Sequence, residues 1–580
     1  MNHYTRFSLL ILAILLTGLL GACHRIQETD ALPRRSDYPD LIRYAFTPSN
    51  PGERAVPMAD LGAWHGISLP DGSDKTLGVS GPYLLGEFRW TGPWLTAFSL
   101  SGDVHEDAGW DHYSAVSYPG LFCIEASRNQ VDIRLETLFS SLRSYMNHIV
   151  LHNTGEKAVQ LQPAWYGSVF SPAAFQQSER GFIITTELGQ LMVSFSGFDA
   201  FDLSIESDTA YVAGLKEAML LEPGEQRSFV SVVSYMPYGE DPSTEWPHVN
   251  QALEHPLRHL EDNQKRWNQY LKSVIRTDLP GLDYVPVKSL QTLITNWKTP
   301  TGDLRHQGLV PSMAVSYFYG FWAWDSWKHA VALAMFDLDL ARDQVRTMFD
   351  YQDSLGMVAD CVFPLPEENN WRDTKPPLAA WAVYEIYKAS HDLAFVSEML
   401  TPLEDYHQWW YNYRDIDRNG LCEWGSTDGT LIAAKWESGM DNAVRFDHAE
   451  MLEYKPWAHS MNLESVDLNA YLYLEKQLLA EMYTLIGNRA MAEKHQHEAQ
   501  NLKMLIDQVF FNQQEGYYFD VELGTQRHLS AAGPEGWTPL WCGLSPEDKA
   551  EAVIQVMLDT ARFNTFVPLP TLDASHPEFA

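Results

Sequence analysis

The sequence is poor in basic residues and in cysteine. Of its 580 residues, 41 are lysine or arginine and 76 are aspartate or glutamate, so the formal net charge is −35. Such an acidic balance excludes a nucleic-acid partner, which would need a basic surface. Of the five cysteines, Cys123, Cys361, Cys422 and Cys542 show neither a CxxC pair nor a metal-like spacing. We expect these four to be buried as small apolar residues, although one disulfide among them is compatible with the sequence.

Long apolar runs and common catalytic signatures are also missing. The chain contains no GxSxG, HExxH, Walker A or dinucleotide-binding fingerprint, which argues against serine hydrolases, zinc proteases and nucleotide-dependent enzymes. After residue 20 no stretch is long and apolar enough to cross a bilayer. The length itself predicts two to four domains, with room for one large barrel.

One apolar run lies at the start of the chain. Residues 7–20 follow Arg6 and are almost all apolar, and Gly21 and Ala22 then precede Cys23. This segment resembles a bacterial lipoprotein signal peptide, which predicts a signal peptide over 1–22, a lipidated Cys23 and a tether over 23–36. The protein would then be lipid-anchored in the bacterial cell envelope, facing the periplasm or the surface. The alternative is an uncleaved membrane anchor.

Aromatic residues are abundant, with 20 tryptophans, 27 tyrosines and 26 phenylalanines. Their flat apolar faces suit stacking against sugar rings, but a large aromatic core would explain the same composition.

The chain changes character near residue 245. From about 37 to 245, short alternating runs bounded by turn residues predict an antiparallel β-sandwich. Residues 246–285 predict a helical linker, with an amphipathic helix over 249–271. From 286 to 580 almost every segment has a helical period, and the helices are long enough to pair as antiparallel hairpins in a toroid.

Three loops before predicted helices concentrate tryptophan, carboxylates and basic residues. They are 321–330 (FWAWDSWKHA), 371–381 (WRDTKPPLAAW) and 436–447 (WESGMDNAVRFD). Because such loops converge on one end of a helical toroid, they can share a sugar site. Asp441 is the candidate general acid, which would protonate a glycosidic oxygen. The alternative for Asp441 is a helix N-cap, because Ser438 and Asp441 precede a predicted helical turn.

These three motifs resemble glycoside hydrolase family 63, which includes the processing α-glucosidase I and bacterial α-glucosidases. The resemblance covers 317–580 and is weaker over the sandwich. It implies an N-terminal super-β-sandwich, an (α/α)6 barrel and inverting hydrolysis of α-glucosidic bonds in oligosaccharides. It also implies that Asp441 is the general acid and that a glucose-binding pocket is lined by Trp324, Asp325, Trp371, Lys375 and Glu437.

The match has one departure. An inverting enzyme needs a second carboxylate about 6.5–9.5 Å from the acid. In the family this base is a glutamate that follows a Trp-Arg-Gly-Pro-Val-Trp-like stretch, and neither occurs here. We therefore expect the sequence to stop within an incomplete barrel, so that the chain as written lacks its general base.

A second predicted site lies between two helices. Asp415, Asp417, Asn419 and Glu423 place oxygen atoms at alternate positions, with Gly420 at the sharp turn of a calcium loop. The carbonyl of Leu421 would be a further ligand. The alternative is an Asp/Asn/Gly turn without a metal; bacterial relatives in the family bind calcium, which favours a structural Ca²⁺.

Two other functions remain open from the sequence. One is a trehalase-like hydrolase, because trehalases share a related Glu-Ser-Gly-Trp-Asp motif. The other is a surface glycan-binding lipoprotein without turnover, which the missing base allows.

Overall fold

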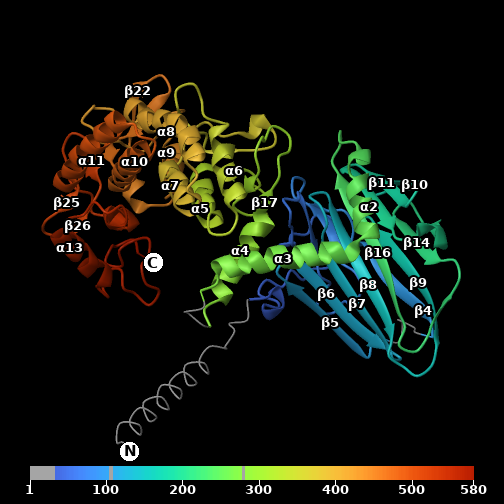
Figure 1. Cartoon of the computed structure of the whole chain (residues 1–580). Coiled ribbons are helices and arrows are strands. Elements are labelled where there is room, and N and C mark those ends of the chain that lie inside the picture. The colour runs from blue at the N-terminus through green and yellow to red at the C-terminus, as the bar shows by residue number, and fades with distance from the viewer. Residues whose placement is uncertain (1–32, 104–108, 277–280, 580) are drawn as a thin grey trace, which may run out of the picture.

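The computed structural model describes residues 33–103, 109–276 and 281–579, which form a strand-rich region followed by a helical region (Figure 1). The predicted order of sheet and then helices is therefore confirmed. Cys23 lies outside the described residues, so its lipidation stays a prediction. Within the described ranges, no helix is both long and apolar enough to cross a membrane.

Two main antiparallel sheets build the strand-rich region. The larger has the strand order β10-β11-β12-β16-β8-β7-β6-β5, and in the smaller β9 lies between β14 and β15 and also pairs with β4. The larger sheet consists of β5 (His112–Tyr118), β6 (Leu121–Arg128), β7 (Val131–Phe139), β8 (Ser144–Asn153), β10 (Ala174–Ser178), β11 (Gly181–Thr186), β12 (Gly189–Phe195) and β16 (Gln226–Met236). The smaller consists of β4 (Trp94–Gly102), β9 (Val159–Ser168), β13 (Phe201–Ile205), β14 (Ala210–Leu215) and β15 (Met219–Leu221). A third sheet joins β1 (His65–Ser68), β2 (Ser80–Leu84) and β3 (Arg89–Trp90).

Alternating side chains place the core between the two main sheets. Along β7 the apolar Val131, Ile133 and Leu135 are buried, while the polar residues between them are exposed. Rings from the two sheets meet directly: Trp165 of β9 lies 5.8 Å from Phe195 of β12. The sheets thus face each other across one aromatic core, and part of the aromatic excess belongs to it.

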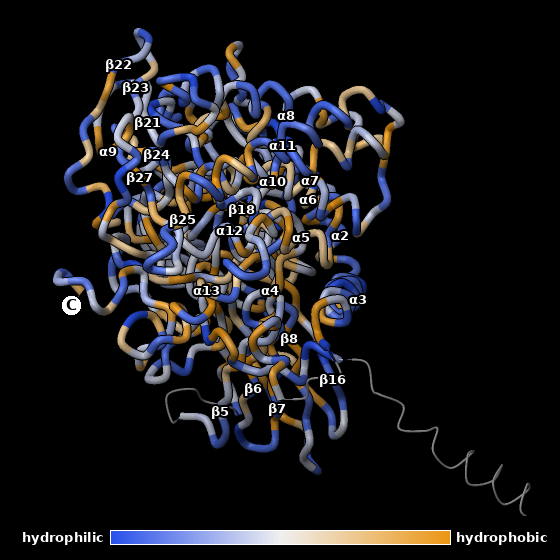
Figure 2. Tube along the Cα trace, turned by 90° about the vertical axis from the view of Figure 1, so that its left-hand side faces the viewer, coloured by the Kyte–Doolittle hydropathy of each residue, from blue (hydrophilic) through white to orange (hydrophobic). Residues whose placement is uncertain are grey.

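The linker is two helices rather than one. α2 (Trp246–Glu254) ends at Glu254 with His255 as its C-cap, and α3 (Pro256–Val274) begins at Pro256. The predicted single helix over 249–271 is wrong at this point, because proline lacks the N–H that a continuous helix needs and is favoured at the first helical position. The apolar side of α2 covers the outer face of the larger sheet, whereas α3 is largely hydrophilic (Figure 2).

The remaining helices follow one another around an arc that starts near the sandwich and ends near the C-terminus (Figure 1). α5 pairs with α6, α7 with α8 and α10 with α11, while α5, α7, α10 and α12 contact one another in that order. Their bounds are α4 (Tyr284–Asn296), α5 (Ala323–Leu333), α6 (Leu338–Phe349), α7 (Ala379–Ser390), α8 (Leu393–Tyr413), α9 (Leu431–Ser438), α10 (Val466–Leu485), α11 (Arg489–Val509), α12 (Thr538–Trp541) and α13 (Glu547–Leu558).

Short strands connect the loops at the helix ends. They are β17 (Trp297–Lys298), β18 (Gly308–Leu309), β19 (Phe321–Trp322), β20 (Cys361–Val362), β21 (Gly425–Ser426), β22 (Met451–Lys455), β23 (Ala458–Met461), β24 (Leu463–Glu464), β25 (Phe511–Asn512), β26 (Tyr517–Tyr518) and β27 (Val521–Glu522). The four cysteines at 123, 361, 422 and 542 are free and buried, as the sequence predicted.

The sandwich packs directly on the helices. Ala59, Trp64 and Leu85 come from the strand-rich region but belong to the helical core. The indole N–H of Trp64 donates to the Thr299 carbonyl at 2.8 Å, and the Thr299 N–H donates to the Gly62 carbonyl at 2.9 Å. The two regions therefore share a packed junction.

Candidate active site

The first motif leads into α5. Trp322 has an extended backbone and α5 starts at the next residue, so Trp324 and Asp325 lie in its first turn, both half-buried. The pairing of β19 with β20 sets Trp322 opposite Cys361. The Ala323 N–H then donates to the carbonyl of Asp360 at 2.9 Å, which brings Asp360 beside the motif although it is 35 residues away from Asp325.

The second motif supplies a buried lysine between two acids. The Lys375 ammonium lies 3.1 Å from Asp360 Oδ1 and 3.5 Å from Asp373 Oδ2, and all three residues are almost fully buried. The Asn370 amide donates to Asp360 Oδ2 at 2.6 Å and to Asp373 Oδ1 at 3.1 Å. We call Asp325, Asp360, Asp373, Lys375 and Asp441 the charged cluster.

Burial governs the ionisation of this cluster. It raises the pKa of Asp360 against the opposing effect of Lys375, and it raises the pKa of Asp373 well above its usual range with help from the Asp360 charge. Burial alone would lower the pKa of Lys375, but its two carboxylate neighbours raise it. Burial also raises the pKa of Asp325. Lys375 therefore stays charged, and Asp360 and Asp373 share its ammonium as their ion-pair partner.

The third motif meets the other two at Gly439. α9 ends at Ser438, and Gly439 has φ +68°, in the left-handed region that favours glycine. A Cβ at Gly439 would lie only 2.8 Å from ring atoms of Trp324, so the indole packs directly on this turn. The Lys375 ammonium donates to the Trp436 carbonyl. These contacts join all three motifs.

Asp441 lies at the exposed edge of the cluster. The nearby short helix, Val444–Phe446, has Ala443 as its N-cap, so Asp441 is not a helix cap. Among the described residues, none donates a hydrogen bond to the Asp441 carboxylate. Its charge nevertheless reaches inward, because it raises the pKa of both Asp360 and Lys375. Asp441 is thus an accessible carboxylate next to the buried Asp360, Asp373 and Lys375.

Glu437 has a different environment. It is fully buried, and Arg414 binds it with two hydrogen bonds, Nη2 to Oε1 at 2.7 Å and Nε to Oε2 at 2.8 Å. The Gly425 N–H donates to Oε2 at 2.6 Å, and the Thr374 N–H approaches Oε1 at 3.4 Å. Since protein donors occupy both oxygens, Glu437 is placed to hold the second and third motifs together.

Trp371 lies at the surface, with 36% of its area exposed, and the Thr427 hydroxyl donates to its carbonyl at 2.9 Å. Its neighbour Arg372 pairs with Asp428 at 2.6 Å and stacks over the Trp436 ring at 5.0 Å. The structure therefore brings Trp324, Asp325, Lys375, Glu437 and Asp441 together and sets Trp371 on an adjoining surface.

Sequence reasoning missed Asp360 and Asp373 as members of the cluster. Asp373 lies inside the second motif, two residues before Lys375. Residues at this spacing share one face of an extended segment, so the sequence could have predicted that the two pair. Asp360 lies outside the motifs, and only the pairing of β19 with β20 brings it to them.

A second buried ionic cluster was also missed. Arg445, four residues after Asp441, pairs with Asp467 at 2.6 Å and Asp520 at 2.7 Å, and its Nε lies 4.0 Å from Glu535. Burial raises the pKa of Asp520 to about 6 and that of Glu535 to about 7. These contacts fix the end of the Asp441 loop to the start of α10 and to the segment before α12.

The predicted calcium loop folds as a compact acidic turn. Carboxylate oxygens of Asp415, Asp417 and Glu423 lie within 4.8 Å of one another. The N–H groups of Asn419 and Gly420 donate to Asp415, at 3.0 Å and 3.1 Å, and Gly420 has φ +91°. The Leu421 N–H donates to the side-chain oxygen of Asn419 at 2.8 Å.

A fourth carboxylate comes from β24, where the Asn419 amide donates to Glu464. One oxygen of Glu423 and one of Glu464 are buried without a hydrogen-bond partner. Burial raises the pKa of Glu423 well above its usual range and that of Glu464 to about 7, with further increases from Asp415 and Asp417. An all-oxygen donor set with unpaired buried atoms fits Ca²⁺.

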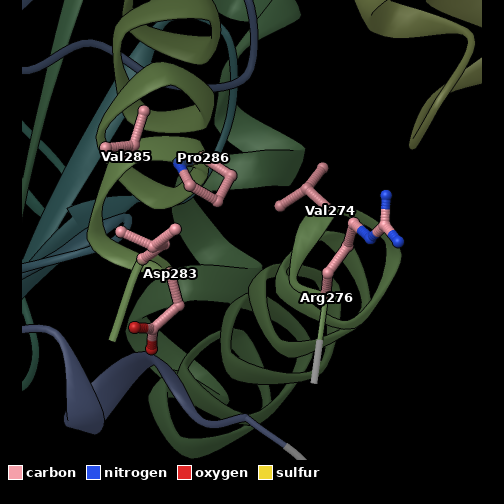
Figure 3. A pocket seen from close by; sticks show the side chains of 6 residues that line it. Val274, Arg276, Asp283, Val285 and Pro286 are labelled. Atoms are coloured by element: carbon pink, nitrogen blue, oxygen red, sulfur yellow. The ribbon is translucent and has the colours of Figure 1, made fainter. Parts of the chain in front are cut away.

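A separate hollow lies between the end of α3 and the start of α4 (Figure 3). Its lining is mostly apolar and consists of Val274, Arg276, Leu282, Asp283, Val285 and Pro286. None of the residues of the three motifs lines it.

Comparisons with known proteins agree with the motifs. Residues 317–580 match the family described as the mannosylglycerate hydrolase MGH1-like glycoside hydrolase domain. The chain is 24% identical to a trehalase of Dictyostelium discoideum over 274 residues, covering 40% of this chain and 45% of that protein. It is 22% identical to a mannosylglycerate hydrolase of Thermus thermophilus over 322 residues, covering 44% and 75%.

Among solved structures, a family 63 mannosylglycerate hydrolase from Thermus thermophilus in complex with Tris matches at 20% identity and a TM-score of 0.41. That match covers 50% of this chain and 81% of the other. The chain spans less than half the length of the first curated relatives it matches.

Residues 317–580 are thus similar to a glycoside hydrolase domain. This similarity, together with that to a mannosylglycerate hydrolase, agrees with the resemblance to glycoside hydrolase family 63 that the three motifs indicated.

Proposed function

We propose that this protein hydrolyses α-glucosidic bonds in oligosaccharides with inversion, and that Asp441 is the general acid. The observation that carries the proposal is the environment of Asp441: an exposed carboxylate that no described residue hydrogen-bonds, two residues after the turn on which Trp324 packs. A general acid must keep its carboxyl group free for the glycosidic oxygen, and Asp441 does so.

Trp324 and Asp325 would bind the sugar beside Asp441. Lys375 would stabilise the buried acids Asp360 and Asp373 beneath this site. The other acids near Asp441 are less suited to catalysis, because Asp360 and Asp373 are buried and held by Lys375. We therefore assign neither of them as the base that activates water. We further propose that the helical hairpins form part of an (α/α)6 barrel, because α5, α7, α10 and α12 contact one another in sequence order.

The similar proteins suggest other α-linked substrates to test. Two of the proteins similar to this chain are a trehalase and a mannosylglycerate hydrolase, so trehalose and mannosylglycerate belong in the same assay. A surface glycan-binding protein without turnover is the second candidate function, favoured by the absence of an assigned base.

The test is hydrolysis of a panel of α-linked glucose disaccharides, trehalose and mannosylglycerate by the wild type and by Asp441→Asn. We expect the substitution to lower kcat by about 10²–10⁴-fold, the usual contribution of a general acid. Binding of glucose, measured by calorimetry, should be retained. Asp447→Asn is the matched control, since Asp447 is an exposed acid on the same loop that pairs with Lys435.

Full activity in Asp441→Asn would exclude Asp441 as the acid. Glucose binding by a wild type that hydrolyses none of the substrates would favour the glycan-binding function instead.

We also propose that the loop from Asp415 to Glu423 binds a structural Ca²⁺. The ligands would be Asp415, Asp417 and Glu423, with Glu464 from β24, the Asn419 side chain and the Leu421 carbonyl as further oxygen donors. The clustered carboxylates and their unpaired oxygens support this proposal.

A further inference from the structure

Two exposed aromatic rings lie beside the charged cluster. Tyr317 is 57% exposed and Phe318 is 39% exposed. Both belong to the loop that leads into α5. They meet the buried Trp322 nearly edge-on, with ring centroids 5.4 Å and 5.2 Å away. Phe363 packs behind Trp322 at 5.6 Å. We call Tyr317, Phe318 and Trp322 the aromatic platform.

The platform and Asp441 flank the same buried acids. Tyr317 contacts Trp322, which pairs with Cys361, the neighbour of Asp360. Burial and the nearby Cys361, Asp360 and Asp373 raise the pKa of Tyr317 to about 12. The charge of Asp441 also reaches Asp360. Only one residue separates Trp322 from Trp324, whose ring packs on the Gly439 turn before Asp441. A ligand at Asp441 that extends past the first motif would meet these exposed rings.

The sandwich holds this loop in place. Phe88, in the turn between β2 and β3, packs edge-on against Tyr319 at 5.5 Å. Arg54 donates to the Ser316 hydroxyl at 3.3 Å. Tyr319 in turn packs on Phe363 at 5.0 Å, behind the platform. Residues more than 200 positions away in sequence thus set the position of the platform.

The chemistry of this surface selects the ligand. Exposed aromatic faces bind apolar C–H surfaces, while nearby carboxyl groups accept hydrogen bonds from hydroxyls. The charged cluster contains four carboxyl groups and one ammonium, which disfavours a second anion close by. A pyranose ring has apolar faces and neutral hydroxyls, and a glycerate group has a carboxylate instead.

We propose that the aromatic platform binds a second, uncharged pyranose ring, the one released when the bond at Asp441 is cleaved. This inference rests on the proposed function and deepens it. Phe88 is a positioning residue, because it acts on the platform through Tyr319.

The test uses calorimetry on the Asp441→Asn protein, so that disaccharides persist during the measurement. Glucose, a panel of neutral α-linked glucose disaccharides and mannosylglycerate are the ligands. We expect one or more neutral disaccharides to bind at least tenfold more tightly than glucose, and mannosylglycerate to lack this gain. Tyr317→Ala and Phe318→Ala should each lower disaccharide affinity about tenfold and leave glucose affinity unchanged.

Phe88→Ala should weaken disaccharide binding in the same direction, and the milder Phe88→Leu less so. Trp457→Ala is the control, since Trp457 is 63% exposed between β22 and β23 and belongs to no part of the platform. Thermal unfolding of each variant separates lost binding from lost folding.

The outcomes separate the two proposals. Glucose binding with no loss of disaccharide affinity in Tyr317→Ala and Phe318→Ala overturns the platform alone. An equal loss for glucose and disaccharides overturns it too, because the rings would then belong to the first sugar's site. If the wild type and Asp441→Asn bind no sugar, the proposed function fails and the platform fails with it.

Discussion

At the scale of single residues, two acids of one motif have opposite surroundings. Asp441 is exposed and lacks a hydrogen-bond donor among the described residues, whereas Glu437 is fully buried and accepts bonds from Arg414 and Gly425. An unpaired exposed carboxylate can exchange a proton with a substrate. A carboxylate that is saturated by protein donors contributes to structure, since breaking a buried pair leaves a charge without compensation.

Glu437→Gln should therefore destabilise the protein strongly. The substitution leaves the fully buried Arg414 without its partner charge, which costs about 3–5 kcal/mol in similar pairs. Urea unfolding monitored by circular dichroism measures the loss. Glu125→Gln is the control, because Glu125 and Arg134 form a half-exposed pair worth less than about 1 kcal/mol.

A Glu437→Gln protein as stable as the wild type, but unable to bind glucose, would show instead that Glu437 contacts the sugar.

At the scale of elements, the acidic turn between α8 and α9 holds three clustered carboxylates, and backbone N–H groups alone do not balance their negative charge. Asp415 receives two N–H bonds, yet burial still raises its pKa, and Glu464 from β24 adds a fourth carboxylate. A divalent cation would balance these charges and tie the turn to the start of α10.

Calcium should raise the thermal midpoint, and more at pH 8 than at pH 5.5. Without metal, Glu464 has a folded pKa of about 7, above its unfolded value. Stability from this group is therefore greatest below the unfolded value and falls as the pH rises towards 7. Ca²⁺ binds the ionised carboxylate, so it restores stability at the pH where Glu464 would otherwise be charged and unpaired. A free Ca²⁺ concentration of 100 times the Kd stabilises the fold by about 2.7 kcal/mol.

Thermal unfolding in EDTA and in excess Ca²⁺ measures this effect. Glu423→Gln should remove most of the response, while Asp339→Asn, a change at a 93% exposed acid on α6, should retain it. An equal midpoint in EDTA and Ca²⁺ at pH 8 would leave the acidic turn without a calcium site.

At the scale of the whole molecule, the sandwich and the helical region share one packed core. Trp64 is 6% exposed and belongs to the helical core, and its indole N–H binds the Thr299 carbonyl. Phe88 reaches the loop that carries the aromatic platform. The two regions should therefore lose structure together when their junction is damaged.

Trp64→Ala tests this coupling. Truncating a buried tryptophan costs about 3–5 kcal/mol, and here the cavity would open between the two regions. We expect faster hydrogen exchange in β1 and in α5 and α6, measured by mass spectrometry. Trp165→Ala, inside the sandwich core, should accelerate exchange mainly in β4, β9 and β12. Faster exchange confined to β1 in Trp64→Ala would show that the regions are independent.

Local sequence patterns determined the elements and the motifs. Alternation along β7 and β8, and helical periods such as those of α8 and α11, follow from which side chains must be buried, so they are readable without neighbours. The motifs around Asp325, Lys375 and Asp441 were likewise visible, as was the acidic turn at Asp415. The general base and the lipid on Cys23 stay predictions.

Only the tertiary structure decided which residues meet. Asp360 joins Lys375 because β19 pairs with β20, and Glu437 is buried where Arg414 and the Gly425 N–H bind its carboxylate. Phe88 reaches the platform from a different region of the chain. These contacts depend on long-range pairing and on burial, and both are set by the packing of distant segments. The sequence of each segment alone carries no record of that packing.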